Sequence, residues 1–294
     1  MSARARFALL AAVLTLAGTA ACAPEDEAAA PAASGSETTS ASADTCAKDQ
    51  LQVVTAGKFT VGTDKPAYSP WFVDDDPTNG KGFESAVAYA VADELGFTAS
   101  EVSWIVVPFT NAYAPGDKKF DVDINQVSIS EARRKAVDFS SGYYDVAQAV
   151  VSVKGSKIDG ATSIDALKEA KLGAQVGTTS YTAITDQIQP TAKPAVYDTN
   201  DLAVQALKNG QVEGIVVDLP TAFGIVAVQL DDGVIVGQLP AGTGTPDQFG
   251  LVLAKGNPLT SCVSQAVDAL KSDGTLADLE EQWLTGTDGA PVLS

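Results

Sequence analysis

The feature that most constrains the fold of this chain is a junction between a strand and a helix at residues 120–134. Residues 120–124 (FDVDI) alternate apolar and acidic side chains, as a β-strand with one buried face does. Polar residues interrupt that pattern at 125–130, and a charged helical start follows with Arg133. Unpaired N–H groups at a helix start, with a guanidinium nearby, suit a carboxylate. The junction predicts an anion seat; the alternative is a strand, a turn and a solvated basic face.

Strand-type and helical segments follow one another along most of the remaining chain. The apolar runs that we expect to form strands are residues 58–63, 102–107, 148–153, 172–176, 214–217 and 249–253. The segments that we expect to form helices are residues 82–96, 163–170, 181–188, 202–209 and two apolar stripes between residues 263 and 283. Open α/β sheets bind ligands beyond the carboxyl ends of their strands, so the residues that follow each strand are the first candidates for a site.

An aromatic loop follows the first expected strand. Residues 62–64 (GTD) end that strand, and residues 65–72 (KPAYSPWF) combine two prolines with three aromatic side chains. Loops at strand ends commonly carry binding residues, so we expect Tyr68 and Trp71 to contact a ligand and Phe72 to enter the core. The alternative is a proline-stiffened loop whose aromatic side chains cap the core.

Two other strand ends carry polar residues. Residues 177–180 (GTTS) place hydroxyl groups at an expected helix start, which predicts a second anion seat. A hydroxyl N-cap explains the same residues, and the two roles are compatible. Asp218 ends strand 214–217 and precedes an expected helix that starts at Leu219-Pro220. An acid at this position points into the ligand crevice of an α/β sheet or caps the helix, and the sequence leaves both open.

Composition and charge exclude several classes of function. The sequence has no histidine, which removes Ser-His-Asp and Cys-His nucleophile systems and imidazole metal sites. Neither G-x-S-x-G nor S-x-x-K occurs, so serine hydrolases and transpeptidases are poorly supported. The formal net charge of −18 makes nucleic acid a poor partner. We therefore expect no catalytic residues, no metal and no cofactor.

The N-terminus has the pattern of a targeting segment. Arg4 and Arg6 precede an apolar run at residues 7–17, and small residues lead to Cys22. This arrangement predicts a secretory signal at residues 1–21, because the apolar run is too short to span a bilayer. A Cys after small residues resembles the lipobox of bacterial lipoproteins, so Cys22 would carry lipid. The alternative is an ordinary signal peptide with Cys22 incidental.

A low-complexity segment follows the predicted signal peptide, and two further cysteines lie beyond it. Residues 22–45 lack large apolar side chains and are rich in Ala, Ser, Thr, Pro and acids, which predicts a disordered tether. Cys46 and Cys262 are the remaining cysteines. In an exported protein such a pair is most simply a disulfide. Two buried free thiols are the alternative.

Taken together, the motifs resemble those of family 3 extracellular solute-binding proteins, the amino-acid receptors of ABC importers. The resemblance covers roughly residues 51–284. Its marks are VGTD at 61–64 with the aromatic loop, GFE at 82–84, SIS at 128–130 with Arg133, VDFS at 137–140, YY at 143–144, GTT at 177–179, VVD at 216–218 and KSDGTL at 271–276. Each mark alone is weak, and their order and spacing make the resemblance specific.

The resemblance implies an α/β, two-lobed fold of the periplasmic-binding-protein type II, with two crossing strands as the hinge. Lobe 1 would comprise residues 46–147 and 248–294, and lobe 2 residues 148–247. A ligand would lie between the lobes, and their closure would create the surface that an ABC permease recognises. The protein would be a monomeric receptor on the outer face of the cell membrane, anchored through lipidated Cys22 and without enzymatic activity.

The resemblance also assigns the binding residues. It implies that Arg133 pairs with the α-carboxylate of an amino acid and that Asp218 accepts from its α-ammonium. The remaining residues that it implies at the ligand are Asp64, Tyr68, Trp71, Phe109, Gln126, Ser128, Gln175, Gly177, Thr178 and Thr179. Gln126 stands where smaller residues are common, and residues 111–119 replace a helix that is usual in the family. Asp64, Phe109 and Gln175 align with positions that can face the ligand side chain. Asp64 could pair with a cationic side chain, but the GTD trio is common in the family whatever the ligand, so we expect only a polar amino acid.

Two other interpretations remain. Some proteins of this fold are prephenate or arogenate dehydratases, which need a proton donor in the cleft. Glu84 is the carboxylate that the motifs nominate, and its alternative role is structural hydrogen bonding beneath the loop. An extracytoplasmic sensor would need a fused membrane or signalling domain, and no such domain follows Leu284 in this sequence.

Overall fold

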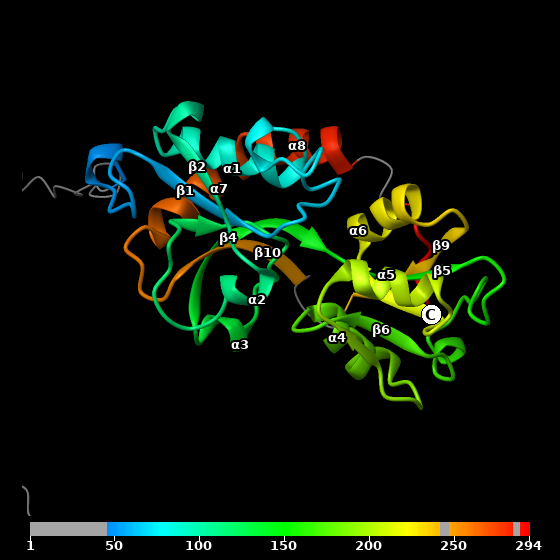
Figure 1. Ribbon diagram of the computed structural model, residues 1–294. Coiled ribbons are helices and arrows are strands. Elements are labelled where there is room, and N and C mark those ends of the chain that lie inside the picture. The colour runs from blue at the N-terminus through cyan, green and yellow to red at the C-terminus, as the bar shows by residue number, and fades with distance from the viewer. Residues whose placement is uncertain (1–45, 242–246, 285–288) are drawn as a thin grey trace, which may run out of the picture. The chain divides into compact units, whose positions relative to one another are not determined.

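A computed structural model describes residues 46–241, 247–284 and 289–294 (Figure 1). These residues belong to one compact unit. The predictions for the signal peptide, for Cys22 and for the tether fall on residues 1–45, outside the described residues. None of the described helices is long and apolar enough to cross a membrane.

The first sheet has five strands in the order β2-β1-β3-β10-β4. Their bounds are β1 (Phe59–Thr63), β2 (Val102–Val106), β3 (Val122–Asp123), β4 (Val137–Val146) and β10 (Asp247–Ala254). Strand β1 runs parallel to β2 and β3, whereas β10 is antiparallel to β3 and β4. The carboxyl ends of β1 and β3 therefore meet at one edge, which brings Asp64 and the junction at residues 125–130 together.

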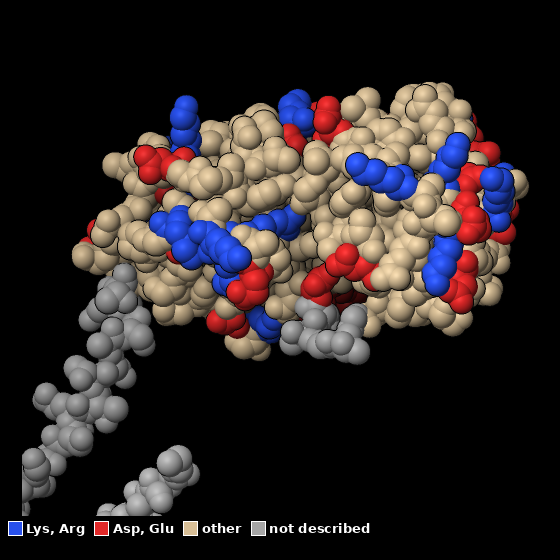
Figure 2. All heavy atoms as spheres, turned by 90° about the horizontal axis from the view of Figure 1, so that it is seen from below, with Lys and Arg blue, Asp and Glu red and all other residues tan. Residues whose placement is uncertain are grey.

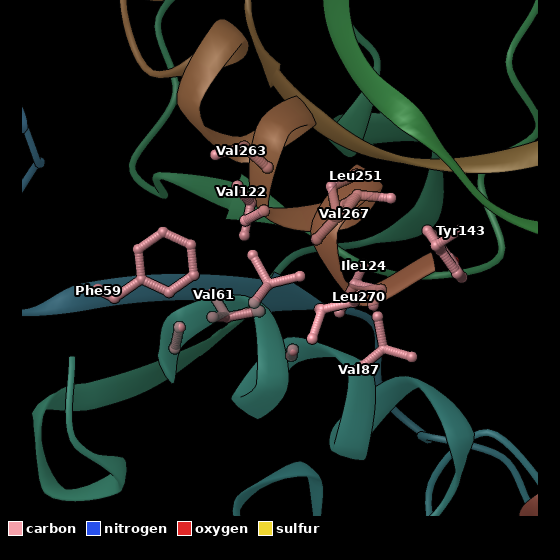
Figure 3. Packing of buried hydrophobic residues seen from close by; sticks show 14 of the residues in the cluster. Phe59, Val61, Val87, Val122, Ile124, Tyr143, Leu251, Val263, Val267 and Leu270 are labelled. Atoms are coloured by element: carbon pink, nitrogen blue, oxygen red, sulfur yellow. The ribbon is translucent and has the colours of Figure 1, made fainter. Parts of the chain in front are cut away.

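Helices cover both faces of the first sheet. The longer helices α1 (Phe83–Glu94), α7 (Thr260–Ser272) and α8 (Thr275–Leu284) contact one another, and the short helices α2 (Phe109–Ala112) and α3 (Glu131–Arg134) contact β1 and β4 (Figure 1). Figure 3 shows apolar side chains of strands and helices packed together, among them Val61, Ile124, Val87 and Val267. Burial of this apolar surface is the main stabilising contribution to this half of the fold.

The second sheet has the order β7-β6-β8-β5-β9. Its strands are β5 (Gln148–Val153), β6 (Leu172–Gln175), β7 (Ala195–Tyr197), β8 (Gly214–Asp218) and β9 (Gly233–Gln238). Apolar clusters cover both faces, with α5 (Asn200–Lys208) and α6 (Leu219–Gly224) on one and α4 (Thr179–Ala183) on the other. Burial on two faces explains why β5 and β8 are nearly continuous runs of apolar residues.

The connections between the sheets confirm the predicted fold class. The chain passes from the first sheet to the second between β4 and β5 and returns between β9 and β10. The disulfide predicted between Cys46 and Cys262 is present, with the two Cα atoms 5.4 Å apart. It attaches the start of the described chain to α7.

The last residues of the chain correct the predicted lobe boundary. Residues 289–294, which we call the C-terminal segment, were expected with the first sheet but contact the second. Val292 forms a parallel bridge with Gln238 of β9, and Leu293 N–H donates to the Gln238 carbonyl at 2.9 Å. Leu293 is 1% exposed and belongs to a core cluster of the second sheet. The segment pairs with the outer edge of β9 at Gln238, the last residue of that strand, and the sequence pattern does not reveal this contact.

Two of the expected helices also differ. Residues 163–170 contain only the 3-10 turn Asp165–Leu167, because packing of the fully buried Leu167 sets the local structure rather than helical propensity. The expected helix at 181–188 begins earlier, as α4, and continues as a π-helical turn at Ile184–Ile188.

Candidate functional site

A polar pocket lies beyond the carboxyl ends of β1, β3, β6 and β8. Its lining residues are Asp64, Pro66, Tyr68, Phe109, Asn125, Gln126, Ser128, Arg133, Gln175, Thr178, Thr179, Asn200 and Asp218. Ten of the twelve predicted binding residues are in this set, and the exceptions are Trp71 and Gly177. The parallel strands of both sheets therefore present their polar ends to one common space.

Arg133 supplies the positive charge of the pocket. Ser130 caps α3 by accepting a hydrogen bond from the Arg133 N–H at 3.2 Å, which fixes the helix start. The Arg133 side chain is buried, and its two terminal nitrogens donate to the carbonyls of Ser128 at 2.6 Å and Gly177 at 2.9 Å. A buried guanidinium whose partners are neutral carbonyls retains an unneutralised charge, which favours an anion beside it.

The two predicted anion seats face each other. Thr178 caps α4 by accepting from the Tyr181 N–H at 3.2 Å and donates to the Gln175 carbonyl at 2.8 Å. The hydroxyl groups of Ser128 and Thr179 lie 3.1 Å apart, although they come from different sheets. Hydroxyl and backbone donors from both sheets thus surround the space in front of Arg133. The N-cap role of Thr178 and a role in anion binding are compatible, as expected from the sequence.

Asp218 supplies a negative charge to the same pocket. Its Oδ1 accepts from Gln148 Nε2 at 2.7 Å, and its side chain makes no capping bond to α6. The residue keeps some solvent exposure, but protein surrounds the carboxylate, and this burial raises the pKa of Asp218 to about 7. Gln148 and Arg133 oppose the shift of the pKa. Asp218 occupies the N-cap position of α6, but its carboxylate does not cap the helix and is available to the pocket.

Glu84 anchors the turn that carries the pocket residues. Gln126 has a left-handed backbone, with φ of 48°, which an L-residue adopts only when its surroundings impose it. Glu84 accepts from the Gln126 N–H at 2.7 Å, and its carboxylate also accepts from the Gln126 side chain and from the Tyr143 hydroxyl. Burial raises the pKa of Glu84 to about 7. Glu84 is fully buried and does not line the pocket, so its contacts correspond to the structural alternative.

The remaining wall of the pocket is polar but carries only one formal charge. Asp64 accepts from the N–H groups of Phe109 at 3.0 Å and Lys65 at 2.7 Å. Asn125 is 8% exposed, and its side-chain Nδ2 has no hydrogen-bond partner among the described residues. A buried free amide donor is costly, so this part of the wall favours a ligand or water that accepts a hydrogen bond.

The structure corrects the expectation for Trp71. Its ring is fully buried, does not line the pocket, and packs edge-on against Phe83, Tyr144 and Phe249. A large aromatic side chain at this position gains more from the apolar core than from the polar pocket. Phe72 is buried, as predicted.

Gly177 contributes differently from the prediction. It does not line the pocket, and its carbonyl accepts from Arg133. Pro66, Asn125 and Asn200 also line the pocket, although the sequence motifs did not identify them. Asn125 belongs to the polar junction and could have been inferred from it. Asn200 starts α5 just after β7, a three-residue parallel strand that was not among the expected strands.

Positively and negatively charged side chains are mixed on the surface of the molecule. Figure 2 shows Lys and Arg side chains interspersed with Asp and Glu, with no single basic patch covering the face that it displays. This distribution differs from the continuous basic surface that phosphate backbones require.

The fold and the pocket together define a two-lobed ligand-binding protein. The sequence profile of bacterial extracellular solute-binding proteins, family 3, matches residues 59–286, which is most of the chain. This protein therefore belongs to the family 3 bacterial extracellular solute-binding proteins, whose curated relatives are amino-acid receptors of ABC transporters.

Individual relatives support the same assignment. The L-cystine-binding protein TcyJ of Escherichia coli is 31% identical over 231 residues, which cover 77% of this chain and 82% of TcyJ. An ancestral arginine-binding protein bound to arginine has a similar structure, with a TM-score of 0.63 and 31% identity. The match covers 77% of this chain and 98% of the ancestral protein. The ancestral amino acid-binding protein AncCDT-1, a precursor of cyclohexadienyl dehydratase, matches with a TM-score of 0.62 and 29% identity. This match covers 78% of this chain and 96% of AncCDT-1.

Proposed function

We propose that this protein is an extracytoplasmic, lipid-anchored receptor that binds a free polar amino acid and delivers it to an ABC permease. The observation that carries the proposal is that Arg133, in α3 beside the first sheet, and Asp218, at the end of β8 in the second sheet, line one pocket. The carboxylate of a zwitterion between them would face Arg133, and its ammonium group would face Asp218. A neutral ligand would leave both buried charges uncompensated.

The pocket divides into parts that fit an amino acid. Arg133, Ser128 and Thr179 would bind the α-carboxylate, and Gly177 and Thr178 would support this seat through their backbone. Asp218 and the Gln126 carbonyl would accept from the α-ammonium. The residues left for the ligand side chain are Asp64, Tyr68, Phe109, Asn125, Gln175 and Asn200.

The polar character of that last group supports a polar amino acid. Most of its members offer an amide, a carboxylate or a hydroxyl, and Asn125 has a free donor. TcyJ binds cystine and the ancestral protein was solved with arginine, both of which have polar side chains. An aliphatic side chain would leave the amide and carboxylate groups unpaired, which disfavours it.

Closure of two lobes around the ligand would couple binding to transport. We assign lobe 1 to residues 46–147 together with the chain from residue 248 to α8, and lobe 2 to residues 148–247 with the C-terminal segment. A ligand held by Arg133 and Asp218 would stabilise the closed arrangement, because each lobe supplies one of the complementary charges. The closed receptor would be a monomer that an ABC permease recognises.

Isothermal titration calorimetry with the common amino acids tests the proposed binding. Arg133→Ala should cost about 2–5 kcal/mol of binding free energy, because the ligand carboxylate would lose its buried charged partner. Arg134→Ala is the matched control, since Arg134 is the adjacent residue, exposed and outside the pocket. Wild-type protein that binds no amino acid at micromolar concentration, or equal affinities of the two variants, would contradict the proposal.

The proposed anchor has its own test. Cells that express the full chain should incorporate labelled fatty acid into the protein, and Cys22→Ser should abolish the label and release the protein from membranes. Incorporation that persists in the variant would exclude Cys22 as the acceptor.

The proposal includes no catalysis. Glu84, the carboxylate nominated for a dehydratase, is enclosed by Gln126 and Tyr143 and does not line the pocket. A general acid must reach the group that it protonates. Incubation with prephenate and chromatographic analysis of products checks this point, and formation of phenylpyruvate by the wild-type protein would contradict it.

A further inference from the structure

Tyr113 lies directly over the guanidinium of Arg133. The residue follows α2, and its ring centroid is 4.5 Å from Arg133 Cζ. The ring of Phe109 is 5.6 Å from the same atom, and the Phe109 and Tyr113 rings meet edge-to-face at 5.3 Å. Cations within about 6 Å of an aromatic face are attracted to it. Two neighbouring aromatic rings thus contact the charged group that faces the pocket.

The hydroxyl group of Tyr113 contacts the opposite sheet. It donates to the Gly177 carbonyl at 3.3 Å, the same oxygen that accepts from Arg133 at 2.9 Å. A Cβ atom at Gly177 would lie 2.4 Å from the Tyr113 hydroxyl oxygen, and Gly177 has φ of +73°. A side chain at Gly177 would therefore displace the Tyr113 hydroxyl group and strain the backbone.

Tyr113 also lines a second cavity, which shares Arg133, Thr178 and Thr179 with the pocket. That cavity, of about 540 Å³, is lined by Tyr113, Arg133 and Gly177 together with Ser130, Thr182 and Asp186. It is wide enough to hold solvent. Arg133 itself lines this cavity, so loss of the Tyr113 ring would expose more of the guanidinium to water and weaken its interaction with a carboxylate in the pocket.

We propose that Tyr113 is a positioning residue for ligand binding: its ring holds and dehydrates the Arg133 guanidinium, and its hydroxyl links the two halves through Gly177. This inference rests on the proposed function of the pocket. Tyr113 does not itself line the pocket and would act through Arg133. The segment 111–119 departs from the family pattern, so Tyr113 gives this chain a contact that the resemblance does not imply.

A test on the ligand-free protein examines the positioning of Arg133 alone. Phenylglyoxal modifies accessible guanidinium groups, and peptide mass spectrometry measures the rate at Arg133, with exposed Arg134 as an internal reference. Tyr113→Leu should raise the rate at Arg133 at least fivefold relative to Arg134, and Tyr113→Phe should leave it within twofold. An unchanged rate in Tyr113→Leu would overturn the proposal, whether or not the proposed function is correct.

Stopped-flow binding then tests the link to Gly177. Tyr113→Phe should raise the ligand dissociation rate constant several-fold with an association rate constant within twofold, because the contact forms only in the closed arrangement. Tyr113→Leu should reduce affinity at least tenfold. Tyr89→Phe is the matched control, since the Tyr89 hydroxyl also donates to a backbone carbonyl, that of Thr78, and Tyr89 does not line the pocket.

The double-mutant combination distinguishes direct contact from general structural damage. Gly177→Ala should weaken binding through the clash with the Tyr113 hydroxyl and through backbone strain. Removing the hydroxyl in Tyr113→Phe/Gly177→Ala should restore part of the affinity. Equal losses from Gly177→Ala in both backgrounds would overturn the proposed link. Failure of the wild-type protein to bind any amino acid would instead contradict the proposed function, and the labelling result would still decide the role of Tyr113 at Arg133.

Discussion

Trp71 donates a hydrogen bond from its indole Nε1 to Thr221 Oγ1 at 2.9 Å, although 150 residues separate the two in sequence. Both side chains are buried, one in the loop after β1 and the other in α6. Beside them, a Cβ atom at Gly224 would lie 2.6 Å from the Ser69 carbonyl oxygen. The aromatic loop thus packs tightly on α6, and its tryptophan joins the two halves of the molecule.

We predict that Thr221→Val destabilises the protein by about 1–3 kcal/mol, because it preserves side-chain shape but leaves the Trp71 N–H buried without a partner. Thr260→Val is the matched control, since the Thr260 Oγ1 is buried without a hydrogen-bond partner in the described structure. Urea unfolding of both variants measures the difference in free energy. A Thr221→Val protein as stable as Thr260→Val would show that the indole bond contributes nothing.

Ligand binding should depend on pH through Asp218, whose pKa is raised to about 7 by burial. An α-ammonium group favours the ionised carboxylate, so binding lowers this pKa and releases a proton. We therefore predict that affinity falls as pH decreases below about 7, by at most about tenfold per pH unit. Calorimetry at pH 6 in buffers with different ionisation enthalpies measures the released protons. Equal affinities at pH 5.5 and pH 7.5 would contradict the assignment of Asp218.

The substitution Asp218→Asn completes this test. Asparagine cannot ionise, so the variant should bind more weakly at pH 7.5 and should lose the proton release. If proton release persists in the variant, another group is responsible. Glu84 is the first such candidate, because its pKa is also raised to about 7.

Asp123 is expected to reduce stability at neutral pH. It is fully buried beside Gly62, and neither of its carboxylate oxygens has a hydrogen-bond partner among the described residues. Burial, followed by the charges of Glu84 and Asp64, raises its pKa well above the ordinary value of 3.8, and Lys118 opposes this shift. The folded state therefore holds the proton more tightly than the unfolded state, and stability is lost as pH rises above about 4.

We predict that Asp123→Asn increases the free energy of unfolding at pH 8 by about 1 kcal/mol or more, with a smaller gain as pH approaches 4. Asp121→Asn is the matched control. Asp121 is also buried, but its two oxygens accept from Val54 N–H and Thr60 N–H, each at 2.7 Å, so its replacement should destabilise. Urea unfolding at both pH values measures these effects. A less stable Asp123→Asn protein at pH 8 would contradict the predicted cost of the buried carboxylate.

The residues of the pocket differ in how far the sequence identifies them. Arg133, Thr179 and Asp218 follow strand-type runs, and the rule that parallel strands end at one edge of a sheet brings such residues together. The local sequence is sufficient to identify these residues, because each lies near the end of a strand or the start of a helix. Asn200 also follows a parallel strand, β7, but three residues are too few for its pattern to be identified. Tyr113 has no such pattern, because packing between segments distant in sequence sets its position.

The sequence likewise identifies only part of the fold. Apolar runs predict seven of the ten described strands, since burial on one or two faces determines residue type along a strand, but they do not predict β4, β7 and β9. They do not identify the partner of a large isolated side chain. Trp71 fits equally well as a pocket or a core residue until Thr221 and Phe249 are placed beside it. The C-terminal segment is too short for a periodic signal, and only the free edge of β9 explains its position.

The C-terminal segment should stabilise the second sheet by covering that edge. The Gln238 N–H donates to the Pro291 carbonyl at 2.8 Å, and the Gln238 carbonyl accepts from Leu293 at 2.9 Å. Leu293 is buried, whereas Val292 in the same segment is 59% exposed. We predict that Leu293→Ala costs about 2–4 kcal/mol of unfolding free energy and that Val292→Ala changes it by less than about 0.5 kcal/mol.

Deletion of residues 290–294 should have a second effect, because it exposes the edge of β9. An unpaired strand edge offers free N–H and C=O groups to other chains, so the truncated protein should self-associate. Analytical ultracentrifugation compares the truncated protein with Val292→Ala. A truncated protein that associates no more than Val292→Ala and is as stable as wild type would show that the contacts of the segment with Gln238 neither stabilise nor protect the sheet.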